Sequence, residues 1–380
     1  MNPSMTRRSF LGVGGLALGL PSLVSAEART KEDPMSQIRP FGRYAELLET
    51  LKGRGHKLRI LGHAPDKSPV VSVKTGGDKQ PPIFMSAGAH ATEQAGVAAA
   101  VELVDRLETR HAVHVVPTRD PIGLNGYRYA LSLALGEEPS IDSVEDAEAL
   151  LREKGDVLYD RDGVLLAFIG EYGYANRSLF RRFEKGEGFL EPLLGRRLFF
   201  PSRSEDEPGA GPLERAYTQV VTPDGEVLHL NRFHDTPWAP VEVRCARELM
   251  GEIRPGLSFD LHEYGGDAYW MSARRQRTED DEQWEERLGR AAVRAVAESG
   301  ARLPEDDYTP GSFFTRLENG LYTLDPSVRG EGLNLVDYAA HHFGPGFTIE
   351  TGMRQEFAHR VRLQMIAVQT AVTLFEQRYA

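Results

Sequence analysis

Residues 82–116 constrain the fold most, because the spacing of their apolar side chains changes twice within a short stretch. Residues 82–86 have the composition of a buried strand, residues 93–108 repeat apolar side chains at helical spacing, and residues 112–116 return to a strand. A strand, a helix and a strand in this order form a β-α-β unit, which builds a mainly parallel sheet. Ligands of such sheets bind at the carboxyl ends of the strands, so the side chains that follow each strand are the first candidates for function.

The other segments extend this pattern, and we expect one α/β domain with a mixed, mostly parallel twisted sheet and helices on both faces. Residues 130–212 are less regular, and we interpret them as an insertion that covers the rim of the sheet. Residues 217–221 and 226–230 flank Thr222-Pro223-Asp224-Gly225, which predicts a hairpin. Further helices are predicted at 44–51, 143–154, 241–253, 279–299 and 356–378, and further strands at 58–61, 70–73, 257–261, 268–271 and 346–349.

The composition excludes several classes of protein. The chain has 380 residues, 41% of them apolar and 27% charged, which is typical of a globular protein. Its formal net charge of −11 disfavours binding to nucleic acid or to anionic lipid, because those partners require a cationic surface. Cys245 is the only cysteine, so the chain cannot form an internal disulfide. No apolar run after the first 26 residues approaches the ~18 residues of a membrane span.

The first 26 residues predict a targeting signal. Thr6-Arg7-Arg8-Ser9-Phe10-Leu11 is a twin-arginine pattern, a mildly apolar stretch follows, and Val24-Ser25-Ala26 supplies small residues for cleavage. A buried N-terminal helix is the alternative, but four glycines and Pro21 disfavour it. We therefore expect export by the twin-arginine route to the periplasm or the medium, with residues 27–380 as the exported domain and no membrane attachment once the signal is removed.

Four side chains that follow predicted strands have the chemistry of a metal site. His90 and Glu93 come directly after the strand at 82–86, and His262 and Glu350 follow two later strands. Catalytic zinc is often held by two histidines and one glutamate, with water in the open position. A further carboxylate nearby can act as a general base. The pair His90 and Glu93 alone is a weak signal, and the coincidence of all three segments gives the prediction its weight.

Five segments, taken in order between residues 83 and 351, resemble the motifs of the zinc carboxypeptidase family. That family is typified by carboxypeptidase A and is related to the succinylglutamate desuccinylases and aspartoacylases. The family's first ligand motif, G-x-H-x-x-E, is resembled by Gly88-Ala89-His90-Ala91-Thr92-Glu93, and its N-P-D-G loop by Asp120-Pro121-Ile122-Gly123, with Asp in the Asn position. Its L-N-R motif is resembled by Leu230-Asn231-Arg232 and its third-ligand strand by Asp260-Leu261-His262. Its F-T-x-E motif is resembled by Phe347-Thr348-Ile349-Glu350.

This resemblance implies one zinc ion per chain and hydrolysis of a peptide bond next to a free C-terminal carboxylate. The implied roles are zinc ligation by His90, Glu93 and His262, proton transfer from the attacking water to the leaving amine by the general base Glu350, and binding of the substrate carboxylate by Asn231 and Arg232. The physical chemistry agrees, because a guanidinium binds a carboxylate through two parallel hydrogen bonds.

Two further family features have more than one candidate counterpart in this chain. An arginine that stabilises the oxyanion is expected somewhat under twenty residues before the L-N-R arginine, where Arg215 lies, and Arg177 and Arg181 are alternatives. The family also has a tyrosine about twenty residues before the base. This chain has no tyrosine at that position, and Tyr322 and Tyr338 are the nearest candidates.

Two other functions stay open at this point. One is a zinc-dependent deacylase of N-acyl amino acids, as in the desuccinylase and aspartoacylase relatives, and the other is a non-catalytic peptide-binding protein on the same fold. The helix predicted soon after Glu350, where those relatives have an additional β domain, favours the peptidase. The expected partner is a peptide or an N-acyl amino acid, and the oligomeric state is open.

Overall fold

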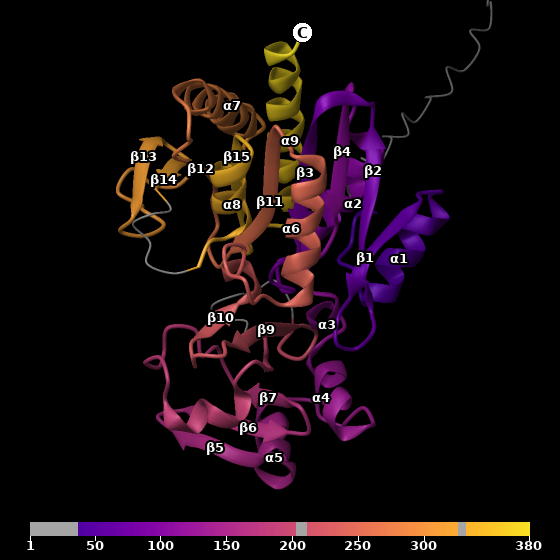
Figure 1. Ribbon diagram of the computed structural model, residues 1–380, viewed down its shortest axis with the longest axis vertical. Helices are drawn as coiled ribbons and strands as arrows, with labels where there is room; N and C mark the ends of the chain where they lie inside the picture. The colour runs from indigo at the N-terminus through magenta and orange to yellow at the C-terminus, as the bar shows by residue number, and fades with distance from the viewer. Residues whose placement is uncertain (1–36, 203–210, 326–331) are drawn as a thin grey trace, which may run out of the picture.

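The computed structural model describes residues 37–202, 211–325 and 332–380, and the targeting signal predicted at residues 1–26 lies outside these ranges. In the described parts, a nine-stranded sheet forms the body of the molecule (Figure 1). Its strands, in spatial order, are β1 (Leu58–His63), β2 (Pro69–Gly76), β4 (His111–Val116), β3 (Lys79–Ala87), β11 (Leu257–Tyr264), β15 (Gly346–Gly352), β12 (Tyr269–Arg274), β14 (Leu321–Leu324) and β13 (Phe314–Glu318).

The centre of this sheet is parallel and its flanks are mostly antiparallel. Strands β4, β3, β11 and β15 pair in parallel, as the β-α-β pattern predicted. Strands β1 and β2 pair antiparallel on one side, and β12 pairs antiparallel with β15 on the other. The central strands are apolar because helices cover both of their faces. The predicted α/β fold with a mixed sheet is confirmed.

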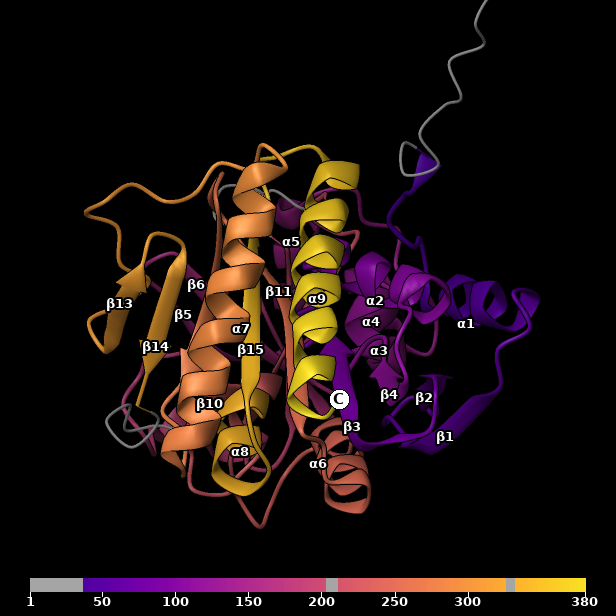
Figure 2. The same ribbon diagram turned by 90° about the horizontal axis from the view of Figure 1, so that it is seen from above.

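Side chains along the central strands point alternately to the two faces of the sheet, and different helices cover each face. Helices α2 (Gln94–Arg106), α7 (Glu279–Glu298) and α9 (Phe357–Arg378) share one apolar core with Phe259, Leu261 and Ile349. Figure 2 shows α7 and α9 side by side. Helices α6 (Val241–Ile253) and α8 (Leu335–His342) cover the opposite face. Because successive side chains of a strand point to opposite faces, His262 and Glu350 lie on the α6 and α8 face.

A second sheet, formed largely by the predicted insertion, lies beside the carboxyl ends of the central strands (Figure 1). Its strands, in spatial order within the described residues, are β10 (Val227–His229), β9 (Ala216–Val221), β8 (Arg197–Pro201), β7 (Tyr172–Ala175), β6 (Val164–Ile169) and β5 (Asp156–Arg161). The shorter elements outside the two sheets are α1 (Tyr44–Gly53), α3 (Pro121–Leu124), α4 (Tyr127–Leu135), α5 (Val144–Lys154) and the 3₁₀ turns η2 (Gly188–Leu193) and η3 (Leu230–Arg232).

The irregularity expected for residues 130–212 is wrong in part, since β5 to β8 lie there. Strands β5 and β6 form a hairpin whose loop is Asp162-Gly163, and both loop residues have positive φ, at 53° and 71°. Asp-Gly between two strands is a strong signal for such a turn. The predicted hairpin of β9 and β10 is confirmed, and it continues the same sheet. None of the helices in the described ranges is both long enough and apolar enough to span a bilayer.

Candidate metal centre

Two segments from the central strands bring the predicted ligands together. The chain leaves β3 at Ala87, turns through Gly88 to Glu93 and enters α2 at Gln94, which places His90 and Glu93 at the edge of the sheet. Gly88 has φ +57°, and a Cβ at this position would lie 2.4 Å from Thr118 Oγ1. A glycine is therefore required at the start of the turn. The third ligand, His262, lies on the adjacent strand β11.

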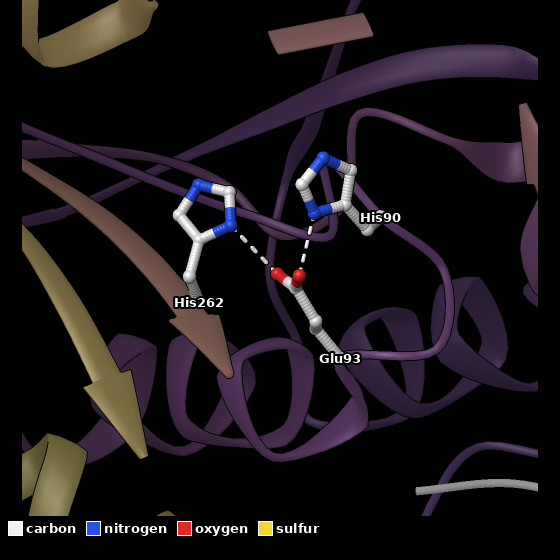
Figure 3. A group of neighbouring side chains, drawn as sticks. All are labelled: His90, Glu93 and His262. Atoms are coloured by element: carbon white, nitrogen blue, oxygen red, sulfur yellow. Dashed lines mark hydrogen bonds and ion pairs between the residues drawn. The ribbon is translucent and has the colours of Figure 1, made fainter. Parts of the chain in front are cut away.

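The three side chains converge on one point (Figure 3). His90 Nδ1 lies 2.5 Å from Glu93 Oε1, and His262 Nδ1 lies 2.6 Å from Glu93 Oε2. One ligand atom from each residue lies within 4.8 Å of the others, the single such group in the described part of the chain. Two imidazole nitrogens and a carboxylate are the donor set of many catalytic zinc sites. His90, Glu93 and His262 therefore fit a zinc ion and are the residues that would hold it.

Electrostatics prepare Glu93 for this role. Burial opposes its ionisation, but the adjacent His90 and His262 outweigh burial and lower its pKa to about 2. Glu93 is thus a carboxylate at neutral pH, the form in which it can bind a metal. Burial lowers the pKa of His90, whereas Asp260 and Glu93 raise the pKa of His262 against the effect of burial. The two histidines therefore experience different surroundings.

Each histidine has an outer partner that orients its ring. His90 Nε2 lies 2.9 Å from His229 Nδ1, and His262 Nε2 lies 2.8 Å from Asp260 Oδ2. Hydrogen bonds at the outer nitrogens fix the rings so that both Nδ1 atoms face the common point. Sequence reasoning missed His229, which ends β10 in the second sheet. Its position directly before Leu230-Asn231-Arg232 was the available signal.

Glu350 lies beside this cluster. It pairs in parallel register with His262, so the two side chains emerge next to each other on the same face of the sheet. Burial raises the pKa of Glu350 to about 8, Glu93 and Asp260 add to the rise, and His262 opposes it. Its Oε2 accepts no hydrogen bond from any described residue. The structure thus places a carboxyl group of raised pKa next to the three candidate ligands.

The two residues predicted to bind the substrate carboxylate lie in different surroundings. Arg232 donates to the Asn231 carbonyl oxygen at 2.9 Å, and its guanidinium lies 5.9 Å from the centre of the Phe180 ring. Its charge contributes to lowering the pKa of His90, which places it near the cluster. Asn231 is buried and contacts Asp260 and His262 instead of lining an open surface.

The structure does not bring Arg215 to the metal cluster. In the described residues, its guanidinium donates to the backbone carbonyls of Phe41, Gly42 and Glu214, which fixes the segment ahead of α1. These backbone contacts occupy the guanidinium, so the distance of Arg215 from Arg232 along the sequence did not predict which groups it contacts.

Of the two alternative arginines, Arg181 is the one connected to the cluster. Its guanidinium lies 5.1 Å from the centre of the Phe180 ring, and that ring lies 4.7 Å from the ring of His229. Arg181 also has φ 56°, which is uncommon for a residue with a side chain. Arg177 lies near Gly163 in the hairpin of β5 and β6.

The tyrosines close to Glu350 are not the predicted ones. The charge of Glu350 adds to the effect of burial in raising the pKa of both Tyr264 and Tyr308, so both lie near it. Tyr322 is buried behind them and donates to the Tyr308 carbonyl oxygen at 3.2 Å. Tyr338 packs against the ring of His342 at 4.4 Å. Tyr264 follows His262 by two residues on β11, which was the signal that could have found it.

No family model matches the chain, and no curated protein matches it in sequence. Solved structures do match. One is described as a putative metallopeptidase from Shewanella amazonensis SB2B; it has 15% identity and a TM-score of 0.47, and the match covers 87% of this chain and 91% of that chain. Another is described as a putative metallopeptidase from Shewanella denitrificans OS217; it has 14% identity and a TM-score of 0.48, and the match covers 87% of this chain and 88% of that chain. A third is carboxypeptidase A from Helicoverpa armigera; it has 13% identity and a TM-score of 0.45, and the match covers 92% of this chain and 79% of that chain.

Proposed function

We propose that this protein is a zinc-dependent carboxypeptidase that hydrolyses the amide bond next to a free C-terminal carboxylate. One observation carries the proposal: His90, Glu93 and His262 converge in one cluster, and beside it lies Glu350, whose Oε2 has no hydrogen-bond partner among the described residues. Three ligands of the right type together with a general base are the parts that metal-assisted hydrolysis requires.

Each residue has a defined task in this mechanism. His90, Glu93 and His262 would hold a zinc ion, which when bound would supply Lewis-acid activation of water and of the substrate carbonyl. Glu350 accepts a proton from the attacking water at Oε2 and transfers it to the nitrogen of the leaving amine. Its raised pKa suits this transfer, because an acid–base group works best when its pKa is close to the working pH.

Two arginines complete the proposal. Arg232 binds the terminal carboxylate of the substrate, since its guanidinium lies near His90 and has the fork geometry that carboxylates match. Arg181, through its contact with the Phe180 ring next to His229, is better located than Arg215 to stabilise negative charge on the carbonyl oxygen. The substrate is then a peptide or another amide that ends in a free carboxylate.

The test is a hydrolysis screen of C-terminal peptides against N-acyl amino acids, with the zinc-loaded chain and with Glu350→Gln as the control. The proposal expects release of the C-terminal amino acid by the wild type and its loss in Glu350→Gln, with zinc content unchanged. Cleavage of N-acyl amino acids alone would indicate the deacylase. Tight peptide binding without turnover in either protein would indicate a binding protein.

We also propose that the chain is exported by the twin-arginine route, on the basis of Arg7-Arg8 and Val24-Ser25-Ala26. N-terminal sequencing of the exported product should begin at Glu27, and substitution of both arginines by lysine should retain the protein in the cytoplasm. Export of that double variant at the wild-type level would contradict the proposed route.

A further inference from the structure

A buried group of charged and polar side chains lies directly beneath His262. Arg119, which follows β4, is fully buried and donates to both carboxylate oxygens of Asp260, at 2.7 Å each. Asp260 is also fully buried and precedes His262 by two residues on β11, so both point to the same face. Further hydrogen bonds to the carboxylate help a buried ion pair offset the cost of desolvation. Asp260 accepts such hydrogen bonds from His262 and from Asn231.

Both ends of the Asn231 amide are used inside this group. Its Oδ1 accepts from Arg119 Nη1 at 3.0 Å and from the backbone N–H of Leu335 at 3.3 Å. Its Nδ2 donates to Asp260 Oδ2 at 3.1 Å and lies 3.0 Å from His262 Nε2. The two donors at Oδ1 determine which end of the amide carries the oxygen. Asn231 is 3% exposed, and turning it toward a substrate would leave two buried N–H groups unpartnered.

His234 completes the surroundings of Arg119. Burial lowers its pKa to about 3, and the charge of Arg119 lowers it further in the same direction, so its ring is neutral at physiological pH. Its Nε2 lies 3.4 Å from Arg119 Nη1, where a neutral ring can accept a hydrogen bond. The guanidinium is thus held from three directions by Asp260, Asn231 and His234.

We infer that Asn231 and Arg119 are positioning residues of the metal centre and that Asn231 does not bind the substrate. They hold Asp260 in the orientation in which it accepts the Nε2–H of His262, and this leaves Nδ1 of His262 facing Glu93. The inference rests on the proposed function for the metal itself. It departs from the role that the L-N-R motif implied for Asn231, and it leaves recognition of the substrate carboxylate to Arg232.

The test compares zinc affinity in the full-length wild type, Asn231→Ala and the control Asn176→Ala. Asn176 is also a buried, hydrogen-bonded asparagine, but it follows β7 of the second sheet and contacts Leu165, Glu148 and Gly163. Competition with a chromophoric chelator at pH 7 gives the zinc dissociation constant. Removal of an outer partner of a metal ligand typically weakens binding about 10- to 100-fold. Because Asn231 acts on His262 through Asp260, we expect the lower end of this range, about tenfold, in Asn231→Ala. We expect no change in Asn176→Ala, and an altered visible spectrum of the cobalt(II)-substituted Asn231 variant.

The outcomes separate the alternatives. Zinc affinity within twofold of the wild type and an unchanged cobalt spectrum, with a raised KM, would make Asn231 a substrate ligand and overturn the inference. An equal loss in Asn176→Ala would assign the effect to general destabilisation and overturn it as well. If Asn231→Ala does not fold, Asn231→Ser leaves a smaller cavity and carries the same expectation. Wild type that binds no zinc would overturn the proposed function, and the inference with it.

Discussion

Replacement of Glu350 by glutamine should affect activity and stability in opposite directions. Glu350 is the proposed general base, and such groups contribute roughly 10²- to 10⁴-fold to rate. The substitution keeps the size of the side chain and loses no protein hydrogen bond at Oε2, because no described residue donates to that atom. We therefore expect kcat to fall by about 10²-fold or more while the fold and the zinc content stay intact.

The stability of the metal-free protein should rise in the same variant. The pKa of Glu350 is raised from its ordinary 4.5 to about 8, so the folded state takes up a proton that the unfolded chain releases above pH 4.5. The contribution of protonated Glu350 to the free energy of unfolding is fully present below pH 4.5 and is lost as the pH rises toward 8. Between pH 4.5 and 8, the free energy of unfolding of the wild type falls by about 1.4 kcal/mol per pH unit. At pH 7 the glutamine variant, which does not titrate, should therefore be more stable than the wild type by up to about 3 kcal/mol.

Urea unfolding of both proteins in the presence of a chelator, at pH 5 and at pH 7, measures this difference. We expect a small difference at pH 5 and a clear advantage of Glu350→Gln at pH 7, together with its loss of turnover when zinc is supplied. A variant that is less stable than the wild type at pH 7 would mean that contacts hold Glu350 ionised. A variant with wild-type kcat would remove Glu350 from the mechanism.

Three further outcomes follow from the geometry. His229→Ala should raise the zinc dissociation constant about tenfold, because it removes the outer partner of His90. Chelator competition measures this constant, and an unchanged value would contradict the role of His229. Arg181→Met should lower kcat by about 10²-fold, whereas Arg215→Met should lower only the melting temperature. If steady-state kinetics show the opposite pattern, Arg215 is the catalytic arginine. Gly88→Ala should destabilise the fold by about 2 kcal/mol or more, since φ is +57° and the new Cβ would meet Thr118, and a wild-type melting temperature would refute this.

The convergence of the proposed metal ligands was predictable because it depends on topology more than on detailed packing. Parallel strands deliver their following residues to one edge of the sheet, so His90, Glu93, His262 and Glu350 could be expected to meet once the strands were recognised. The pairing of His262 with Glu350 in one register turns that expectation into direct proximity. Fold class followed from the same β-α-β pattern.

The surroundings of the ligands were not predictable, because they depend on segments far apart in the sequence. The engagement of Asn231 requires Arg119 from the end of β4 and the backbone of Leu335 from α8. His229 reaches His90 only because the second sheet lies at the carboxyl ends of the central strands. A motif indicates the type of residue at a position, whereas packing decides which group its side chain contacts.

The zinc content of the purified chain, measured for the wild type beside His262→Ala, tests the central claim most directly. Elemental analysis after dialysis should find about one zinc ion per wild-type chain and much less in the variant, since His262 supplies one of the three ligand atoms. A wild type that stays free of metal after zinc is supplied, or a variant that retains a full complement, would contradict the assignment of His90, Glu93 and His262 as a zinc site.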